Sequence, residues 1–359
     1  MSKIIRERKM ISHALLLAGL LTLLNGVVLA EKQKVVSDKN EYGGQTLEEA
    51  FEPGDKLYGD AVKKIVYYDS AGKEVKEEYF CTDKFAREKG TDKKIVFFDA
   101  NGIMIKAELF YTAVFAGEYG YERLIADFRN NKVTREELFY TKRFANENGL
   151  SRSITYFNDS GGNLKKDEYF FTDRFAGEKG VKKKIVYRGS TGKVTKEELF
   201  FTEKFADEKG FDTDIAVFDN DGKKTEEDRF YIKKFADEKG VNMSVTYFDG
   251  NEKVVEEKLL YTNLFASRKG YGRAITYFDS NEKLKEEEIF YTDKFSGDKG
   301  VNRSITYFDG EGKMTSTEYF YTDKFAAEEG YDKSKAYFDG DGKTTNQEFY
   351  INGRPIDKK

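Results

Sequence analysis

The chain has 359 residues, of which 35% are charged and 15% are aromatic, and its formal net charge is −4. It contains one histidine, one cysteine and no tryptophan. A mildly acidic surface of mixed charge argues against a nucleic acid as the partner, and a single cysteine excludes a disulfide within the chain.

The first 30 residues have the three parts of a secretory signal peptide. A basic start that ends at Lys9 precedes an apolar run from Ala14 to Leu24, and small residues follow up to Ala30. This run is shorter than the ~20 residues of a membrane-spanning helix, so we expect cleavage before Glu31 and a mature chain that does not span a membrane. Cleavage removes four basic residues and one acidic residue, which changes the net charge from −4 to −7. The protein is then expected to be secreted, in the periplasm, at the cell surface or outside the cell.

Cleavage also removes His13, the one histidine of the chain. Without histidine, the mature protein can form no Ser-His-Asp triad, no Cys-His pair and no imidazole metal site. We therefore predict that it is not an enzyme and has no cofactor. Cys81 occupies a repeat position that elsewhere holds Phe171 or Tyr231. We interpret Cys81 as a small apolar residue in an aromatic column; a reactive thiol or an intermolecular disulfide is the alternative.

A phrase of about thirty residues recurs nine times from Lys64 onward, and each copy closes on a glycine. The closing glycines are Gly90, Gly120, Gly149, Gly180, Gly210, Gly240, Gly270, Gly300 and Gly330. Self-similarity at such a period predicts a stacked array in which each unit contacts mainly its neighbours. We divide the chain into a signal peptide (1–30), an N-terminal capping segment (31–60), nine tandem repeats (61–330) and a C-terminal capping half-repeat (331–359).

Each repeat begins with the pattern of a β-hairpin, as in the unit that ends at Gly330. Ser304–Phe308 is rich in β-branched and aromatic residues, which favour a strand. Asp309–Gly312 fits a type I turn that ends in a left-handed glycine, and Lys313–Tyr321 is the expected return strand. Both faces of such strands are partly apolar, so we expect the sheet to be layered between its helices and another part of the array.

A short helix follows the hairpin in each repeat. Thr322 is a good N-cap, and Gly330 is a good C-terminal cap with Tyr331 as its apolar partner. A helix of two turns is not stable alone in water, so Phe325 and Ala326 must dock on the sheet. The predicted fold class is α+β, a solenoid array of about nine units, each a β-hairpin plus a short helix.

Both ends of the array depart from the repeat. Thr46–Phe51, which precedes Pro53-Gly54, has the pattern of a degenerate helix. At the other end, Tyr350–Pro355 replaces the helix. Lys335 replaces the usual isoleucine, as expected for a terminal strand that has no neighbour beyond it.

Acidic residues suggest two kinds of site, and we predict neither. Doublets such as Glu77-Glu78 recur in most repeats, but adjacent residues on a strand point to opposite faces and form no catalytic dyad. We expect Glu78 to lie opposite Lys64 as a cross-strand ion pair. Asp219–Gly222 and Asp339–Gly342 resemble calcium loops, but they lack an acidic residue at the first ligand position and are explained as turns. No metal site is predicted.

A column of tyrosines is the candidate binding site. One hydroxyl-bearing ring recurs at the same position of the first strand in most repeats, which indicates partial exposure. Such a ladder stacks on sugar rings or on a protein partner; the alternative is packing in the core. The candidate binding residues are Tyr67, Tyr156, Tyr187, Tyr247, Tyr277, Tyr307 and Tyr337.

The hairpin phrase also resembles two known repeat families. Phe97–Met104 and Tyr307–Met314 are similar to the Tyr-Phe-Asp-x-x-Gly-x-Met phrase of choline- and glucan-binding cell-wall repeats. That resemblance implies surface attachment through aromatic pockets between consecutive hairpins. The aromatic-Asn/Asp-Gly-Lys hairpin with acidic flanks resembles MORN-variant repeats, which implies a non-catalytic interaction scaffold.

We therefore expect a secreted, non-catalytic repeat scaffold that binds a protein or a polysaccharide of the cell envelope. One alternative is a glycan-binding module that attaches to the cell wall through the tyrosine ladder. A second alternative is a structural fibre subunit whose terminal repeats pair end to end between copies.

Overall fold

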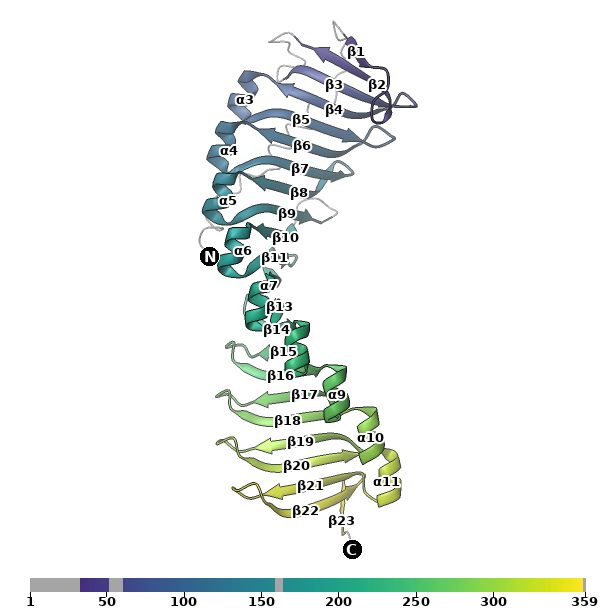
Figure 1. Ribbon diagram of the computed structural model, residues 1–359, viewed down its shortest axis with the longest axis vertical. Coiled ribbons are helices and arrows are strands. Elements are labelled where there is room, and N and C mark those ends of the chain that lie inside the picture. Colours follow the sequence, from purple (N-terminus) through teal and green to yellow (C-terminus); the bar gives the residue numbers. More distant parts are fainter. Residues whose placement is uncertain (1–32, 52–60, 159–163, 358–359) are drawn as a thin grey trace. The chain divides into compact units, whose positions relative to one another are not determined.

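The computed structural model describes residues 33–51, 61–158 and 164–357. The expected signal peptide and the Pro53-Gly54 break lie outside the described residues. The chain forms two compact units that divide between Glu147 and Asn148. Both units are built from the same β-hairpin and helix, which Figure 1 shows along the chain.

In the first unit, the strands are β1 (Gln33–Ser37), β2 (Gly43–Ala50), β3 (Ala61–Asp69), β4 (Glu74–Cys81), β5 (Thr91–Phe98), β6 (Met104–Tyr111), β7 (Tyr121–Arg129) and β8 (Lys132–Tyr140). Its helices are α3 (Asp83–Lys89), α4 (Ala113–Tyr119) and α5 (Lys142–Asn148), the last of which crosses the division.

In the second unit, the strands are β9 (Leu150–Phe157), β10 (Leu164–Phe171), β11 (Val181–Arg188), β12 (Val194–Phe201), β13 (Phe211–Phe218), β14 (Lys224–Tyr231), β15 (Val241–Phe248), β16 (Val254–Tyr261), β17 (Tyr271–Phe278), β18 (Leu284–Tyr291), β19 (Val301–Phe308), β20 (Met314–Tyr321), β21 (Lys333–Phe338), β22 (Thr344–Ile351) and β23 (Arg354–Ile356). Its helices are α6 (Asp173–Lys179), α7 (Glu203–Lys209), α8 (Lys233–Lys239), α9 (Asn263–Lys269), α10 (Asp293–Lys299) and α11 (Asp323–Glu329).

Within each unit, every strand pairs antiparallel with the next strand in sequence, and the sheet stays open. The predicted hairpin turn is confirmed. Asp309 Oδ1 accepts the backbone N–H groups of Glu311 and Lys313 at 2.8 and 2.9 Å. Gly312 has φ of 80°, the left-handed conformation expected at that position.

The short helices and their caps are also confirmed. Thr202 begins α7 by accepting the N–H of Phe205 at its hydroxyl, and Gly210 ends it with φ of 90°. The Phe205 ring stacks on Phe201, the last residue of β12, with ring centroids 4.6 Å apart. This stack is how a two-turn helix docks on the sheet.

The closing glycine of one repeat packs tightly against the helix of the next repeat. A Cβ built on Gly210 would stand 2.8 Å from Cγ of Phe235 in α8 and nearer still to Cδ2. Phe235 in turn stacks on Tyr231 at the end of β14, at 4.8 Å. We call this set an aromatic lock: a closing glycine, the phenylalanine of the next helix and the aromatic residue that ends the strand before that helix.

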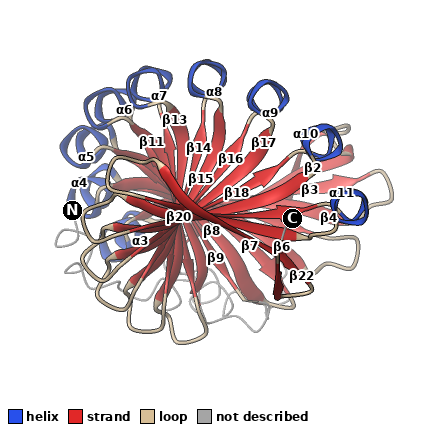
Figure 2. Ribbon diagram, turned by 90° about the horizontal axis from the view of Figure 1, so that it is seen from below, coloured by secondary structure: helices blue, strands red, loops and turns tan. Residues whose placement is uncertain are grey.

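The expected layering of the sheet is wrong. Within each unit, the helices lie at one end of the strands, as Figure 2 shows, and α3, α4 and α6 to α10 each contact the strand that follows. No described element of a unit covers either face of that unit's own sheet. Burial comes instead from side chains of the same face. Leu124 is 1% exposed in a cluster with Val96 and Leu109, and partly buried Tyr79 and Leu138 pack against it.

Three further expectations were wrong. Thr46–Phe51 is not a helix: β2 runs through Ala50 and pairs with β3, because a free strand edge satisfies its backbone groups better than a single helical turn. Lys335 does not lie on a terminal strand, since β21 pairs with both β20 and β22. Lys64 lies opposite Tyr79, one residue out of the expected register, and forms its ion pair with Glu77.

Candidate functional site

The seven candidate tyrosines lie on one sheet face of their units and are all half-buried. We call this the tyrosine face. On the first strand of a repeat such as β11, it carries Lys183, Ile185 and Tyr187, because alternate residues share a face. Equivalent tyrosines are two strands apart, so at about 4.8 Å per strand they recur roughly every 9.6 Å.

The middle of the tyrosine face alternates isoleucine with glutamate from strand to strand. Ile185 pairs with Glu168 on β10 and with Glu198 on β12. Lys166 and Lys183 bind Glu168 at 2.6 and 2.8 Å. Burial alone would raise the pKa of Glu168, but hydrogen bonds from these two lysines outweigh it and hold the pKa below its usual value. The acid therefore stays charged while it separates the isoleucines.

Lysines of the chain itself lie over most of the tyrosine rings. Each ammonium named here stands within 6 Å of a ring centroid, a distance typical of a cation–π contact. They are Lys76 over Tyr67 at 4.3 Å, Lys166 over Tyr156 at 4.2 Å, Lys196 over Tyr187 at 5.3 Å, Lys258 over Tyr247 at 4.4 Å, and Lys335 at 5.3 Å from both Tyr307 and Tyr337. Tyr277 has no described lysine or arginine over its ring.

A second ladder of cations and rings runs along the other margin of the tyrosine face. Arg152 lies 4.0 Å from the ring centroid of Phe170, and Arg273 lies 3.7 Å from that of Phe290. Phe230 breaks this ladder because its cross-strand neighbours are Thr213 and Met243. The Phe230 side chain is 37% exposed, and Leu260, the next rung after Met243, is 37% exposed as well.

In the second unit, the residue paired with the tyrosine changes from a lysine to a glutamate between β12 and β18. Tyr187 pairs with Lys196 on β12, whereas Tyr277 pairs with Glu286 on β18. Glu226 and Glu256 hold the same position on β14 and β16. In the sequence, Glu226 and Glu286 belong to the recurrent acidic doublets, to which we assigned no site. A signal was present, since lysine becomes glutamate nine residues after the tyrosine, but the strand register was needed to show that this residue faces the ring.

For Glu286 and Tyr277, nearby positive charges do not offset the effects of burial and of neighbouring acids. Burial, followed by the charge of Glu288, raises the pKa of Glu286. Burial, followed by the charges of Glu256 and Glu288, raises the pKa of Tyr277. Arg303 binds Glu288 at 2.6 Å, but no described cation forms an ion pair with Glu286.

We expect the E286K substitution to raise the free energy of unfolding by about 0.5 kcal/mol, because side-chain pairs on a sheet face contribute roughly 0.2–1 kcal/mol. A lysine at position 286 would bind Glu288, which is two residues farther along the strand. Lys196 binds Glu198 in this way, at 2.8 Å. E256K is the matched control, since Lys258 stands two residues later there and would repel it. Urea denaturation measures the free energy of unfolding of both variants. A lower value for E286K than for the wild type would contradict the proposed repulsion between Glu286 and Glu288.

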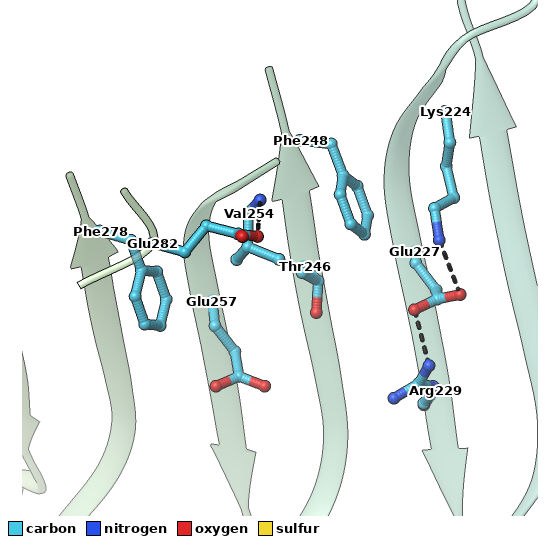
Figure 3. A pocket seen from close by; sticks show the side chains of 9 residues that line it. All are labelled: Lys224, Glu227, Arg229, Thr246, Phe248, Val254, Glu257, Phe278 and Glu282. Atoms are coloured by element: carbon cyan, nitrogen blue, oxygen red, sulfur yellow. Dashed lines mark hydrogen bonds and ion pairs between the residues drawn. The ribbon is translucent and has the colours of Figure 1, made fainter. Parts of the chain in front are cut away.

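A groove of about 470 Å³ lies on the opposite face, over β14 to β17. Figure 3 shows its lining side chains, among which Lys224 and Arg229 both bind Glu227, at 3.1 and 2.8 Å. Glu282 accepts the N–H of Val254 at 3.2 Å. Glu257 lies in the groove with no ion pair to a described residue. Most polar groups of the groove are thus occupied by one another.

The turn aspartates are occupied by backbone groups. Asp219 Oδ1 accepts N–H groups of Asp221 and Lys223 at 2.8 and 2.9 Å, and the Lys223 bond lowers the pKa of Asp219. Across residues 33–51, 61–158 and 164–357, no three acidic, histidine or cysteine side chains gather as metal ligands would. Cys81 is half-buried opposite Ala61, at the strand-end position that holds Tyr111 in the next repeat.

The chain is a repeat protein of β-hairpin units with aromatic clusters. It matches no protein-family model and no curated protein. Similar solved structures include TcdB2-TccC3 without its hypervariable C-terminal region (12% identity, TM-score 0.15), in a match that covers 90% of this chain and 18% of that one. The Dos1 propeller matches at 10% identity and TM-score 0.19, covering 91% and 85%. A putative outer membrane lipoprotein-sorting protein domain from Vibrio parahaemolyticus matches at 9% and 0.13, covering 72% and 83%.

Proposed function

We propose that this protein is a secreted, non-catalytic repeat scaffold of the solenoid type, which binds a protein or polymer at the cell envelope or outside the cell. The observation that carries the proposal is the tyrosine face, which no described element of its own unit covers and on which half-buried rings and charges recur in most repeats. Weak contacts repeated along such a face add up to a high avidity. The resemblance to MORN-variant repeats supports the same role. In the described part of the chain, no helix is both long and apolar enough to cross a membrane.

A protein partner has more support than a glycan. Attachment to a glycan, as in the choline- and glucan-binding repeats, needs ring faces on which sugars stack. Lysines already lie over six of the seven tyrosines, and Tyr277 is the exception. A fibre subunit has less support again, because β23, the last described strand, has three residues and contains Pro355, which blunts a strand edge.

Sedimentation with insoluble envelope material and a panel of polysaccharides tests the proposed function. We expect the protein without residues 1–30 to bind envelope material saturably, and protease treatment of that material to abolish the binding. Replacing both Tyr247 and Tyr277 by alanine should weaken the binding. The matched control replaces Thr246 and Thr276, their neighbours on the opposite face. Absence of binding to every material, or equal loss in both variants, would contradict the proposal.

A further inference from the structure

Each cation ladder of the tyrosine face has a gap within the same five strands, β14 to β18, although Lys258 still lies over Tyr247 and Arg273 still lies beside Phe290. On one margin, Phe230 has no described cation over its ring, and on the other margin, Tyr277 has none. The cross-strand partners of the tyrosines are carboxylates here, and β12 still carries Lys196 at that position. We call the tyrosine face of β14–β18 the acidic segment.

The protein itself shows which ligand these rings accept. Where the partner position is lysine, as at Lys166, the ammonium lies over the tyrosine ring and binds the adjacent glutamate, here Glu168. The acidic segment keeps the ring and the glutamate, as Tyr277 and Glu288, but replaces the lysine by Glu286. The ring and the added carboxylate both attract a cation. A cation from another molecule can therefore take the place that lysine takes elsewhere.

We propose that the acidic segment docks an extended basic segment of a partner polypeptide, with lysine or arginine at every third residue. This inference rests on the proposed function and names its partner class. Glu256 already binds Lys258 of its own strand at 2.9 Å. The basic side chains would therefore lie beside Glu226 and Glu286 and share Glu256 with Lys258, and one of them would lie over the ring of Tyr277. The exposed side chains of Phe230 and Leu260, on the same face, would receive apolar residues of the same partner.

The spacing of the carboxylates selects the period of the partner. Glu226, Glu256 and Glu286 are two strands apart, which is roughly 9.6 Å at about 4.8 Å per strand. A polyproline II segment rises about 3.1 Å per residue with three residues per turn, so every third side chain returns to the same side after roughly 9.3 Å. A strand-like segment would reach roughly 9.9 Å in three residues, at about 3.3 Å each, but alternate its side chains. The match therefore favours the polyproline II conformation.

The test uses synthetic peptides labelled with a fluorophore and titrated with the full mature protein. One peptide has lysine at every third residue over four repeats, and two others have the same composition with lysine at every second or every fourth residue. We expect the first to bind at least about fivefold more tightly at low salt, and all binding to weaken as salt screens the charges. Equal affinity for the three peptides, or no binding, would overturn the proposal.

Neighbouring residues on opposite faces supply the matched control. Replacing Glu256 and Glu286 by glutamine should weaken binding of the every-third-residue peptide about tenfold or more. Replacing Glu257 and Glu287, which point to the other face, should change it less than about twofold. E286K should also abolish the preference, since it supplies a cation to Tyr277 from within. Equal losses in the two glutamine pairs would overturn the assignment to this face.

Failure of this inference and failure of the proposed function give different results. Suppose that the peptides do not bind, that the protein still sediments with envelope material, and that the Tyr247 and Tyr277 double variant sediments less. The scaffold function then stands and the proposed basic partner is wrong. If the every-third-residue peptide binds and competes with envelope material, both stand. If neither the peptides nor envelope material binds, both fail.

Discussion

The Gly210→Ala substitution is expected to lower the free energy of unfolding by about 3–4 kcal/mol. Alanine in the left-handed conformation costs roughly 1–2 kcal/mol, and Gly210 has φ of 90°. The added methyl group would also stand 2.8 Å from Cγ of Phe235, which has to move off Tyr231. Forcing extra volume into a packed contact adds typically about 1–3 kcal/mol.

Gly330→Ala is the control that separates the two contributions. Gly330 ends α11 with φ of 82°, but apart from its chain neighbours no atom lies within 4 Å of the place that an added methyl group would take, because α11 is the last helix of the described residues. We expect this variant to lose about 1–2 kcal/mol, the conformational cost alone. Urea denaturation, with hydrogen exchange to locate the loss in α7 and α8, measures both variants. Equal losses would show that the aromatic lock contributes nothing.

The Glu136→Gln substitution is expected to stabilise the first unit at pH 8 and to leave it unchanged at pH 4. Glu136 is 9% exposed on β8, and burial raises its pKa to about 7. An acid whose folded-state pKa lies above its unfolded value of about 4.5 holds its proton longer in the folded protein, so stability falls as pH rises from 4.5 to 7. The difference between the two pKa values lowers the free energy of unfolding by about 3 kcal/mol above pH 7. Glutamine removes that cost.

The Glu137→Gln substitution, one residue farther along β8, should have the opposite effect on stability. The Glu137 side chain points to the other face and binds Arg135. Glu137→Gln should therefore destabilise the unit at pH 8, because it leaves Arg135 without this carboxylate. Urea unfolding of the three proteins between pH 4 and pH 8 is the measurement. A parallel pH dependence of the wild type and Glu136→Gln would show that Glu136 does not titrate abnormally.

Local signals were sufficient to predict the repeat unit. The Asp309–Gly312 turn and the Thr322 and Gly330 caps each satisfy backbone groups within a few residues, so their chemistry appears directly in the sequence. Thr46–Phe51 also has a local pattern that favours a helix, but pairing of β2 with β3 overrides it. Such pairing depends on what lies across the strand edge, which no local pattern contains.

The single-layered sheet could not be predicted from the alternation of residues. Ile185 is buried although no described element covers it within its unit, because long neighbouring side chains such as Lys183 and Tyr187 lie along the sheet face and bury it. The same alternation would arise in a sheet covered by a second layer. The candidate tyrosines were found from their spacing, whereas the role of Glu286 required the register that pairs it with Tyr277.

The aromatic lock makes neighbouring repeats interchangeable. Gly180 meets Phe205 as Gly210 meets Phe235, so each junction in the second unit joins the same two surfaces. Removing the thirty residues 211–240 would bring Gly210 against Phe265, in a junction of the kind already present. Gene duplication or loss of one repeat can therefore lengthen or shorten the protein without a new interface, and adjust how many contacts it offers a partner while each contact stays the same.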